Sequence, residues 1–323
     1  MAKLYIIGNG FDIAHGLNTS YWNFRSFLEE TDYEFLIEFE KLYNIHPLDC
    51  TEYGYTETAQ KKWNDRVYDT LWSEFEKSMG FPDIQAMLDF SESVLGDLDL
   101  ESGNIGIIDT MNSYWKQQFG FINKLQNYVK EWISSIDLSH VKTRKNLLLN
   151  NDEDYFLNFN YTRVLEDIYQ ADHVLHIHGS IGHNSDTSPF MGHCNQEDID
   201  EHLQHYHEYF DKGYKGEASI HSAVADYLTS IFKDTSQYIR INQFFFNRLS
   251  LVDEVIILGW SIGDVDIPYL NKICNSIKST TKWTVYYYDC KAYHTIHKAL
   301  LENNIIDKFH PKFIKTDDFW DKT

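Results

Sequence analysis

The chain has 323 residues, enough for one large or two smaller domains, and its 16% aromatic residues with only 5 prolines exclude a disordered or low-complexity chain. Its 49 acidic residues outnumber its 28 basic ones, giving a formal net charge of −21. A field of that sign repels phosphate backbones, so no nucleic-acid partner is expected.

Three further features concern location and redox state. No apolar run approaches the length of a transmembrane helix, and the first residues lack a signal-peptide pattern. The cysteines lie far apart without a CxxC pair, which excludes a cysteine-rich zinc site and indicates no disulfide framework: Cys50, Cys194, Cys274 and Cys290. We therefore expect a cytoplasmic protein without a membrane partner.

Short β-branched or aromatic runs bounded by Gly, Asn or Asp predict the strands. In chain order they are Lys3–Gly8, Tyr155–Asn160, Val174–His178, Pro189–Gly192, Val255–Gly259, Trp283–Asp289 and Lys312–Lys315. Several are apolar nearly throughout, as is typical of parallel strands covered on both faces.

Apolar residues at three- and four-residue spacing predict long helices between these strands. They are Tyr33 to Tyr43, Ala59 to Met79, Asp83 to Leu95, Ser113 to Ile136 and most of Gln196–Ser250. One stripe is interpreted as helix–helix core: Trp115, Phe119, Ile122, Leu125, Val129 and Trp132.

Strands that alternate with helices predict an α/β fold with a Rossmann-like, doubly wound, mostly parallel sheet. We expect one domain over residues 1–323, with large helical insertions at about 31–150 and 196–250. Because ligands of such sheets bind at the carboxyl ends of the strands, the residues that follow each strand are the candidate site.

Glycines follow the first strand. Gly8 and Gly10 stand at a strand-to-helix turn, and Gly16 comes six residues later. Such a turn lets the backbone approach a phosphate, which the next helix binds with its free N–H groups. The spacing is not that of the dinucleotide fingerprint, so a tight turn without a ligand is the alternative.

A small polar stretch, Leu17–Arg25, comes next. It either lines a ligand or caps a helix through Thr19 or Ser20. Arg25 is a candidate phosphate partner, and its alternative is a solvent-facing arginine.

Polar residues also end the second and third strands. Asn158 and Asn160 share a strand face and either orient a ribose hydroxyl or a water, or cap the strand end. His176 and His178 share a face as well, and His178 can take a proton near neutral pH. The alternative is a metal site with further ligands from His183, His193, His202, His205 or His207.

The strand at Val255–Gly259 is followed by Ser261, Asp264 and Asp266. Carboxylates at this place can bind ribose hydroxyls, whereas the alternative is capping of a helix by Ser261 or Asp264. The segment also fits the Gly-x-Ser-x-Gly pattern of hydrolases, but the later histidines stand in helical or tail context, which disfavours an esterase.

These motifs resemble the AbiH family, bacterial abortive-infection proteins that act against phage. The resemblance rests on residues 6–17 with Ser20 and Tyr21, on 159–162, on 176–179, and on 259–261 with 264–266. Residues 72–76 also look like an AbiH segment. The motifs cover the core strands, and the resemblance implies an antiphage effector.

AbiH in turn looks like a remote relative of the sirtuin-like NAD-binding and NAD-cleaving domains. This resemblance implies that Asn160 and His178 are the catalytic pair. It also implies a nucleotide site formed by Gly8, Asn9, Gly10, Asp12, His15, Arg25, Gly259, Ser261, Asp264 and Asp266. No metal and no cofactor other than NAD or a related nucleotide are expected.

The chain departs from the sirtuin pattern at three points. The zinc cysteines of deacylases are missing, which argues against deacylation. Thr162 stands where sirtuins carry an aspartate that helps to hold the nicotinamide amide. Asp12 replaces a small residue, and it either supplies that carboxylate or crowds a phosphate.

The leading hypothesis is an NAD glycohydrolase that cleaves the N-glycosidic bond of NAD or a similar nucleotide. His178 acts as general base or activates the ribose hydroxyl, and Asn160 positions water or ribose. The alternatives are a nucleotide-binding sensor that does not cleave its ligand and a metal-dependent nuclease. The trigger stays open, as does the choice between self-association and a partner defence protein.

Overall fold

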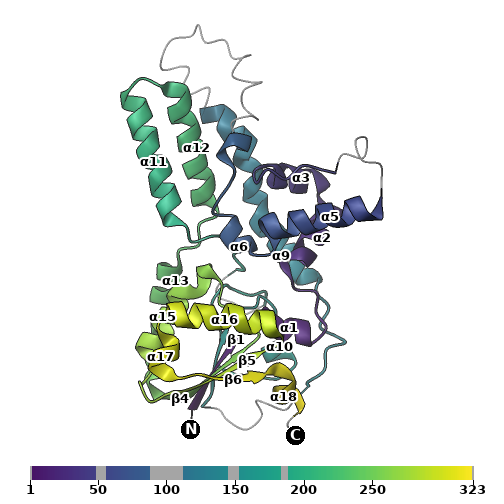
Figure 1. Cartoon of the computed structure of the whole chain (residues 1–323), viewed down its shortest axis with the longest axis vertical. Helices are drawn as coiled ribbons and strands as arrows, with labels where there is room; N and C mark the ends of the chain where they lie inside the picture. Colours follow the sequence, from purple (N-terminus) through teal and green to yellow (C-terminus); the bar gives the residue numbers. More distant parts are fainter. Residues whose placement is uncertain (1, 49–55, 88–111, 145–152, 183–187, 322–323) are drawn as a thin grey trace. The chain divides into compact units, whose positions relative to one another are not determined.

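The computed structural model describes residues 2–48, 56–87, 112–144, 153–182 and 188–321. The chain divides into two compact units (Figure 1). The first unit comprises Met1–Ser20, Val129–Phe190 and Asp234–Thr323, and the second comprises Tyr21–Tyr128 and Met191–Lys233. The regions expected as insertions fall largely in the second unit, although residues 129–150 and 234–250 belong to the first.

The first unit contains a six-stranded sheet and its covering helices. Its strands are β1 (Ala2–Ile7), β2 (Tyr155–Asn158), β3 (Val174–His176), β4 (Val252–Leu258), β5 (Lys282–Tyr287) and β6 (Lys312–Lys315). Its helical elements are α1 (Asn9–Ala14), α10 (Val164–Asp167), α13 (Thr235–Ile241), α14 (Gln243–Arg248), η4 (Leu249–Leu251), η5 (Asp264–Asp266), α15 (Ile267–Ser276), α16 (Cys290–Glu302), α17 (Ile305–Phe309) and α18 (Thr316–Asp321).

All neighbouring strands pair in parallel, in the order β3-β2-β1-β4-β5-β6. This is the doubly wound order of Rossmann-like folds, so the predicted fold class is confirmed. The register pairs Ile7 with both Asn158 and Leu258, and Asn158 with His176. The carboxyl ends of β1, β2, β3 and β4 therefore lie at the same level of the sheet.

Side chains alternate along β1 between two hydrophobic cores, one on each face of the sheet. Leu4 and Ile6 join the core formed with α14, α15, α16 and α17. Tyr5 and Ile7 join the core formed with α1, α10 and α18. Figure 1 shows α16 lying across one face of the sheet. This three-layer arrangement explains why the strands are apolar on both faces.

The second unit is helical in the part of it that the structure describes. Its elements are α2 (Tyr21–Thr31), α3 (Tyr33–Lys41), α5 (Glu57–Val67), η1 (Tyr68–Trp72), α6 (Phe75–Ser78), η3 (Gly120–Lys124), α11 (Gln196–Asp211) and α12 (Lys215–Ser230). Residues 112–119 are also helical, and the chain passes into the first unit within α9 (Leu125–Ser135). Helices α11 and α12 pack along each other (Figure 1).

The stripe predicted as helix–helix core is confirmed, because all six of its side chains are buried: Trp115, Phe119, Ile122, Leu125, Val129 and Trp132. The helix that carries it is interrupted by the 3₁₀ turn η3. Part of the helix predicted over Asp83 to Leu95 lies outside the described residues, which are helical at 84–87.

One strand prediction is wrong. Residues 188–192 have no strand structure, and the next ladder contact is an isolated bridge between His193 and Phe232. Pro189 has no N–H to donate to a sheet, and the amide of Phe190 donates to the carbonyl oxygen of His178 at 3.1 Å. The segment is thus held as a loop against the strand end that follows β3.

In the described part of the chain, no helix is long and apolar enough to cross a membrane. Cys194, Cys274 and Cys290 are free thiols, whereas Cys50 lies outside the described residues.

Arg25 belongs to the second unit and is buried there. Its guanidinium donates to both carboxylate oxygens of Glu40, at 2.7 and 3.1 Å, and the Trp72 indole donates to the same carboxylate. The Arg25 guanidinium also lies over the rings of Trp22 and Trp63. This arginine, expected as a phosphate partner or a solvent-facing residue, has its charge matched by a buried glutamate.

Substitution Arg25→Lys is expected to lower the free energy of unfolding by about 1–3 kcal/mol, because lysine cannot form the two-pronged contact with Glu40. Urea unfolding followed by tryptophan fluorescence measures the loss. The control Arg66→Lys changes an exposed arginine and should stay within about 0.5 kcal/mol of the parent. Equal stability of the two variants would contradict a structural role for the Arg25 contact.

Candidate functional site

The strand order reverses between β1 and β4, which makes the carboxyl ends of these two strands the topological switch point of the sheet. Gly8 follows β1 and Gly259 follows β4 at the same level, since Ile7 pairs with Leu258. Crevices at such points are where doubly wound sheets bind ligands. The glycine motifs predicted from sequence therefore meet here.

The two glycine turns pack directly on each other. The amide of Gly8 donates to the Leu258 carbonyl oxygen at 3.0 Å, and that of Gly10 donates to the Gly259 carbonyl oxygen at 2.9 Å. A Cβ on Gly8 would lie 2.5 Å from the Cα of Trp260, and Gly259 has a φ of +66°. The glycines thus allow backbone-to-backbone contact, and because these amides already serve protein carbonyls, a phosphate bound here needs other donors.

Asp12 is the centre of a buried polar cluster beside this turn. Its carboxylate accepts hydrogen bonds from the Asn160 side-chain amide at 2.9 Å and from the Thr162 hydroxyl at 2.5 Å. The same Asn160 amide also donates to the Gly8 carbonyl oxygen at 3.1 Å. The side chain of Asn158 accepts from the Asn160 backbone. Strand ends β1 and β2 are thereby joined through Asp12, and the carboxylate lies next to Thr162.

Burial raises the pKa of Asp12 to about 6, although the hydrogen bonds from Thr162 and Asn160 and the charge of His176 act in the opposite direction. Because this pKa lies above the ordinary value of 3.8, the folded protein holds a proton between about pH 4 and pH 6 that the unfolded chain has lost. The ionised carboxylate therefore costs stability, and the cost is complete above pH 6.

Substitution Asp12→Asn should raise the free energy of unfolding by about 1–3 kcal/mol at pH 8, with a gain that shrinks as pH falls toward 4. Asparagine keeps an acceptor for Asn160 and can donate to the Thr162 hydroxyl, while it removes the buried charge. Thermal or urea unfolding of both proteins at pH 4.5, 6 and 8 measures the difference. A difference that does not change with pH would contradict the raised pKa.

His178 forms a second buried group. Its Nε2 lies 3.4 Å from Oδ1 of Asp266, and the Trp260 indole donates to the other oxygen of that carboxylate at 2.8 Å. The ring of Phe159 stacks on Trp260 and meets the His178 ring edge-on. Asp266, predicted from the sequence as a nucleotide ligand, is 88 positions away from His178 and reaches it only through the fold.

His176 adjoins the Asp12 group and has a carboxylate partner of its own. Its Nδ1 lies 3.0 Å from the backbone oxygen of Asn160, and its Nε2 lies 2.7 Å from the Glu166 carboxylate. Burial raises the pKa of Glu166, yet the hydrogen bond and charge of His176 bring it to a net value below the ordinary one. Each histidine of the pair thus has a carboxylate, and Glu166 is a further residue that sequence reasoning did not single out.

The remaining predicted residues of the β4 turn lie nearer the surface. Ser261 and Asp264 are exposed, as is Gly10 across the switch point. Between them Ile262 is buried with a φ of +59°, a conformation that β-branched residues seldom adopt. The β4 turn therefore carries exposed polar side chains next to the buried Asp266.

The side chains of Asn9 and His15 form hydrogen bonds within the first unit. Asn9 accepts a hydrogen bond from the Thr19 hydroxyl at 2.5 Å. His15 contacts the Phe11 carbonyl oxygen at 2.7 Å and the Tyr169 hydroxyl at 2.6 Å, packs edge-on against Trp320, and has its pKa lowered by burial. Both ring nitrogens of His15 therefore serve the fold.

The other histidines considered as metal ligands do not lie in the described part of the unit that contains His178. His193, His202, His205 and His207 belong to the second unit, and His183 lies outside the described residues. Nε2 of His193 contacts the Leu228 carbonyl oxygen, and burial lowers its pKa to about 4. Within the described ranges, no cluster of three or more His, Cys, Asp or Glu side chains is arranged to hold a metal ion.

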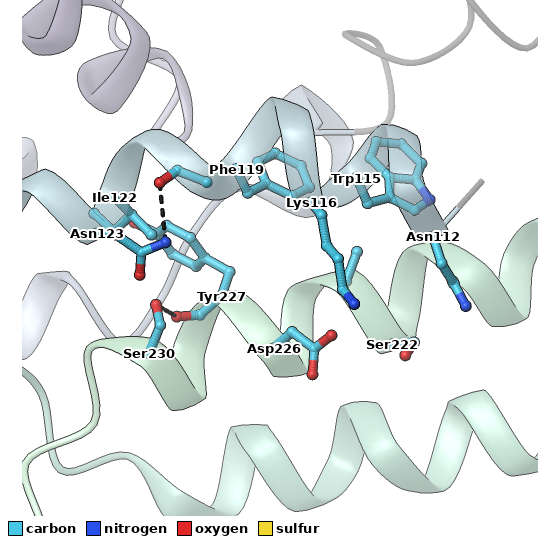
Figure 2. A pocket seen from close by; sticks show the side chains of 12 residues that line it. Asn112, Trp115, Lys116, Phe119, Ile122, Asn123, Ser222, Asp226, Tyr227 and Ser230 are labelled. Carbon is cyan, nitrogen blue, oxygen red and sulfur yellow. Dashed lines mark hydrogen bonds between the residues drawn. The ribbon is translucent and has the colours of Figure 1, made fainter. Parts of the chain in front are cut away.

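The second unit contains a pocket of about 290 Å³ between the helical segment 112–119, η3 and α12 (Figure 2). Trp115, Phe119 and Tyr227 form its buried walls, and the exposed Lys116 and Asp226 stand at its edge. The indole of Trp115 donates to Ser219 at 2.8 Å. The residues that line this pocket include none of those predicted for the site.

Comparison with known families gives one match. The family model described as bacteriophage abortive infection AbiH matches residues 4–287, which run from β1 to the end of β5 and include every strand-end motif of the site. No curated protein and no solved structure matches the chain.

Proposed function

The chain belongs to the bacteriophage abortive infection family AbiH and so has an antiphage role, and from this premise we propose that its switch-point site binds NAD or a related nucleotide and hydrolyses the N-glycosidic bond. The observation that carries the proposal is the convergence of buried polar side chains at one level of the sheet. Asp12, Asn160, His178 and Asp266 all follow the carboxyl ends of parallel strands there.

The chemistry of hydrolysis needs a group that takes a proton from water or from a ribose hydroxyl, and a polar surface that holds the ribose. His178, beside a carboxylate, suits the first task. The Asn160 amide and the Asp12 carboxylate suit the second task, because they follow the carboxyl ends of β2 and β1 and are hydrogen-bonded to each other beside the switch point. Ser261 and Asp264 are exposed at the β4 turn, and their polar side chains suit contacts with the rest of a nucleotide.

The experiment incubates the purified protein with NAD and separates the products by chromatography. Wild type is expected to release nicotinamide and ADP-ribose, whereas the Asn160→Ala/His178→Ala double variant is expected to leave NAD intact. The exposed variant His294→Ala should behave as wild type. Product release by the double variant would overturn the proposal. So would a wild-type protein that, when purified from phage-infected cells, cleaves none of a panel of nucleotides.

A second function, a nucleotide sensor that does not cleave its ligand, is favoured by one observation. The Asn160 amide already donates to two protein acceptors, the Gly8 carbonyl and the Asp12 carboxylate, as a residue with a purely structural task would. A sensor should melt at a higher temperature with NAD present while NAD stays intact, since a ligand at 100 times its Kd stabilises by about 2.7 kcal/mol.

A further inference from the structure

Asp266 stands between two side chains of different elements. One carboxylate oxygen faces Nε2 of His178, which follows β3, and the other accepts the indole hydrogen bond of Trp260 in the β4 turn. The side chains of His178 and Asp266 are 6% and 11% exposed, so water screens their interaction weakly. We infer that Asp266 is the positioning residue of His178 in the proposed hydrolysis, and that it does not bind the nucleotide itself.

Aromatic packing holds both Asp266 and His178 in position. Trp260 fixes one oxygen of the carboxylate, and the Trp260 ring is itself stacked on Phe159 at 4.5 Å between ring centres. The His178 ring is packed by Phe159 and Tyr269. Both partners are therefore held in place before any ligand arrives, and a separation of 3.4 Å is within the range from which such contacts tighten on substrate binding.

The carboxylate of Asp266 also acts on the His178 ring through its charge. A carboxylate beside Nε2 favours the neutral tautomer with its proton on Nε2, and it stabilises the imidazolium that forms when His178 takes a proton. The carboxylate of Asp266 from η5 faces Nε2 of His178, while Tyr161 from the loop after β2 and Tyr269 from α15 pack against the ring. Asp266 is thus a charged partner that acts on the imidazole at close range.

The two carboxylates of the Asp-x-Asp motif differ in exposure and in their contacts. Asp266 is buried and engaged with Trp260 and His178, whereas Asp264 is exposed two residues earlier. A ligand at the surface of the β4 turn meets Asp264. The sequence motif thus combines one carboxylate for the histidine with one for the ligand.

The test is an NMR titration of the imidazole rings in the full-length protein, with the His178 signal assigned by its loss in His178→Gln. Asp266→Asn keeps an acceptor for the Trp260 indole and removes the charge, so it should lower the pKa of His178 by about 1 to 2 pH units. The matched control Asp264→Asn, in the same turn, should leave the His178 titration unchanged. The ¹⁵N shifts of wild type should report the Nε2–H tautomer.

An unchanged His178 titration in Asp266→Asn, or an Nδ1–H tautomer in wild type, would overturn the inference. The tautomer is read from wild type and decides the question even if Asp266→Asn does not fold. These readouts need no turnover, so they separate this inference from the proposed function on which it rests. With NAD as substrate, Asp266→Asn should lower kcat about 10- to 100-fold with little change in KM, whereas Asp264→Asn should mainly raise KM.

Discussion

Substitution His178→Ala is expected to reduce the rate of N-glycosidic cleavage by about 10²- to 10⁴-fold, the usual contribution of a positioned general base. The His178 imidazole can exchange a proton near neutral pH, and the Asp266 carboxylate beside it stabilises its charged form. Because the ring is buried among aromatic side chains, removing it also leaves a cavity. The measurement is therefore made at a temperature where circular dichroism shows the variant to be folded.

The matched control for this prediction is His176→Gln. His176 is the last residue of β3, two residues before His178, and it pairs with Glu166 and contacts the backbone of Asn160. Its loss should affect the rate far less than the loss of His178, because it acts on the position of Asn160. Full turnover by His178→Ala would refute its assignment as the base, whereas equal losses in both variants would indicate a structural disturbance of the strand end.

The elements that sequence patterns predicted well are those whose signal is local. Buried strands such as Ala2–Ile7 are short apolar runs bounded by glycine, and the Trp115 to Trp132 stripe repeats with the helix period. The position of glycines directly after β1 and β4 also followed from sequence, because the strands end there. Their packing against each other did not, since it depends on which strands become neighbours.

The partners of the charged residues could not be predicted from spacing. Arg25 pairs with Glu40 across two helices, and Asp266 reaches His178 because β3 and β4 end at the same level on either side of β1 and β2. The strand predicted at Pro189 is wrong for a different reason. A short apolar run beside glycine has the local pattern of a strand, but the backbone hydrogen bonds of this segment are those of a loop. Local sequence determines which residues end a strand, and the strand order determines what they meet.

The substitution Gly8→Ala tests the contact between the two turns and is expected to lower the free energy of unfolding by more than about 3 kcal/mol. A new Cβ would lie 2.5 Å from the Trp260 Cα and 2.6 Å from the Gly259 carbonyl oxygen. Both are backbone atoms that cannot rotate away, so the turns must separate. Separation would stretch the hydrogen bonds from Gly8 to Leu258 and from Gly10 to Gly259.

Gly16→Ala is the matched control. Gly16 comes after α1, the helix that Gly8 precedes, and it has a φ of +79° with open space around its Cβ position. This substitution adds only the backbone strain of a left-handed residue and should lower the free energy of unfolding by about 1 kcal/mol. Urea unfolding of both variants gives the comparison. Similar losses in the free energy of unfolding would mean that the two turns separate easily, and the backbone at the switch point would then be flexible. A much larger loss for Gly8→Ala would mean that the turn contact is rigid, so that Trp260, and through it Asp266, is held by the glycines.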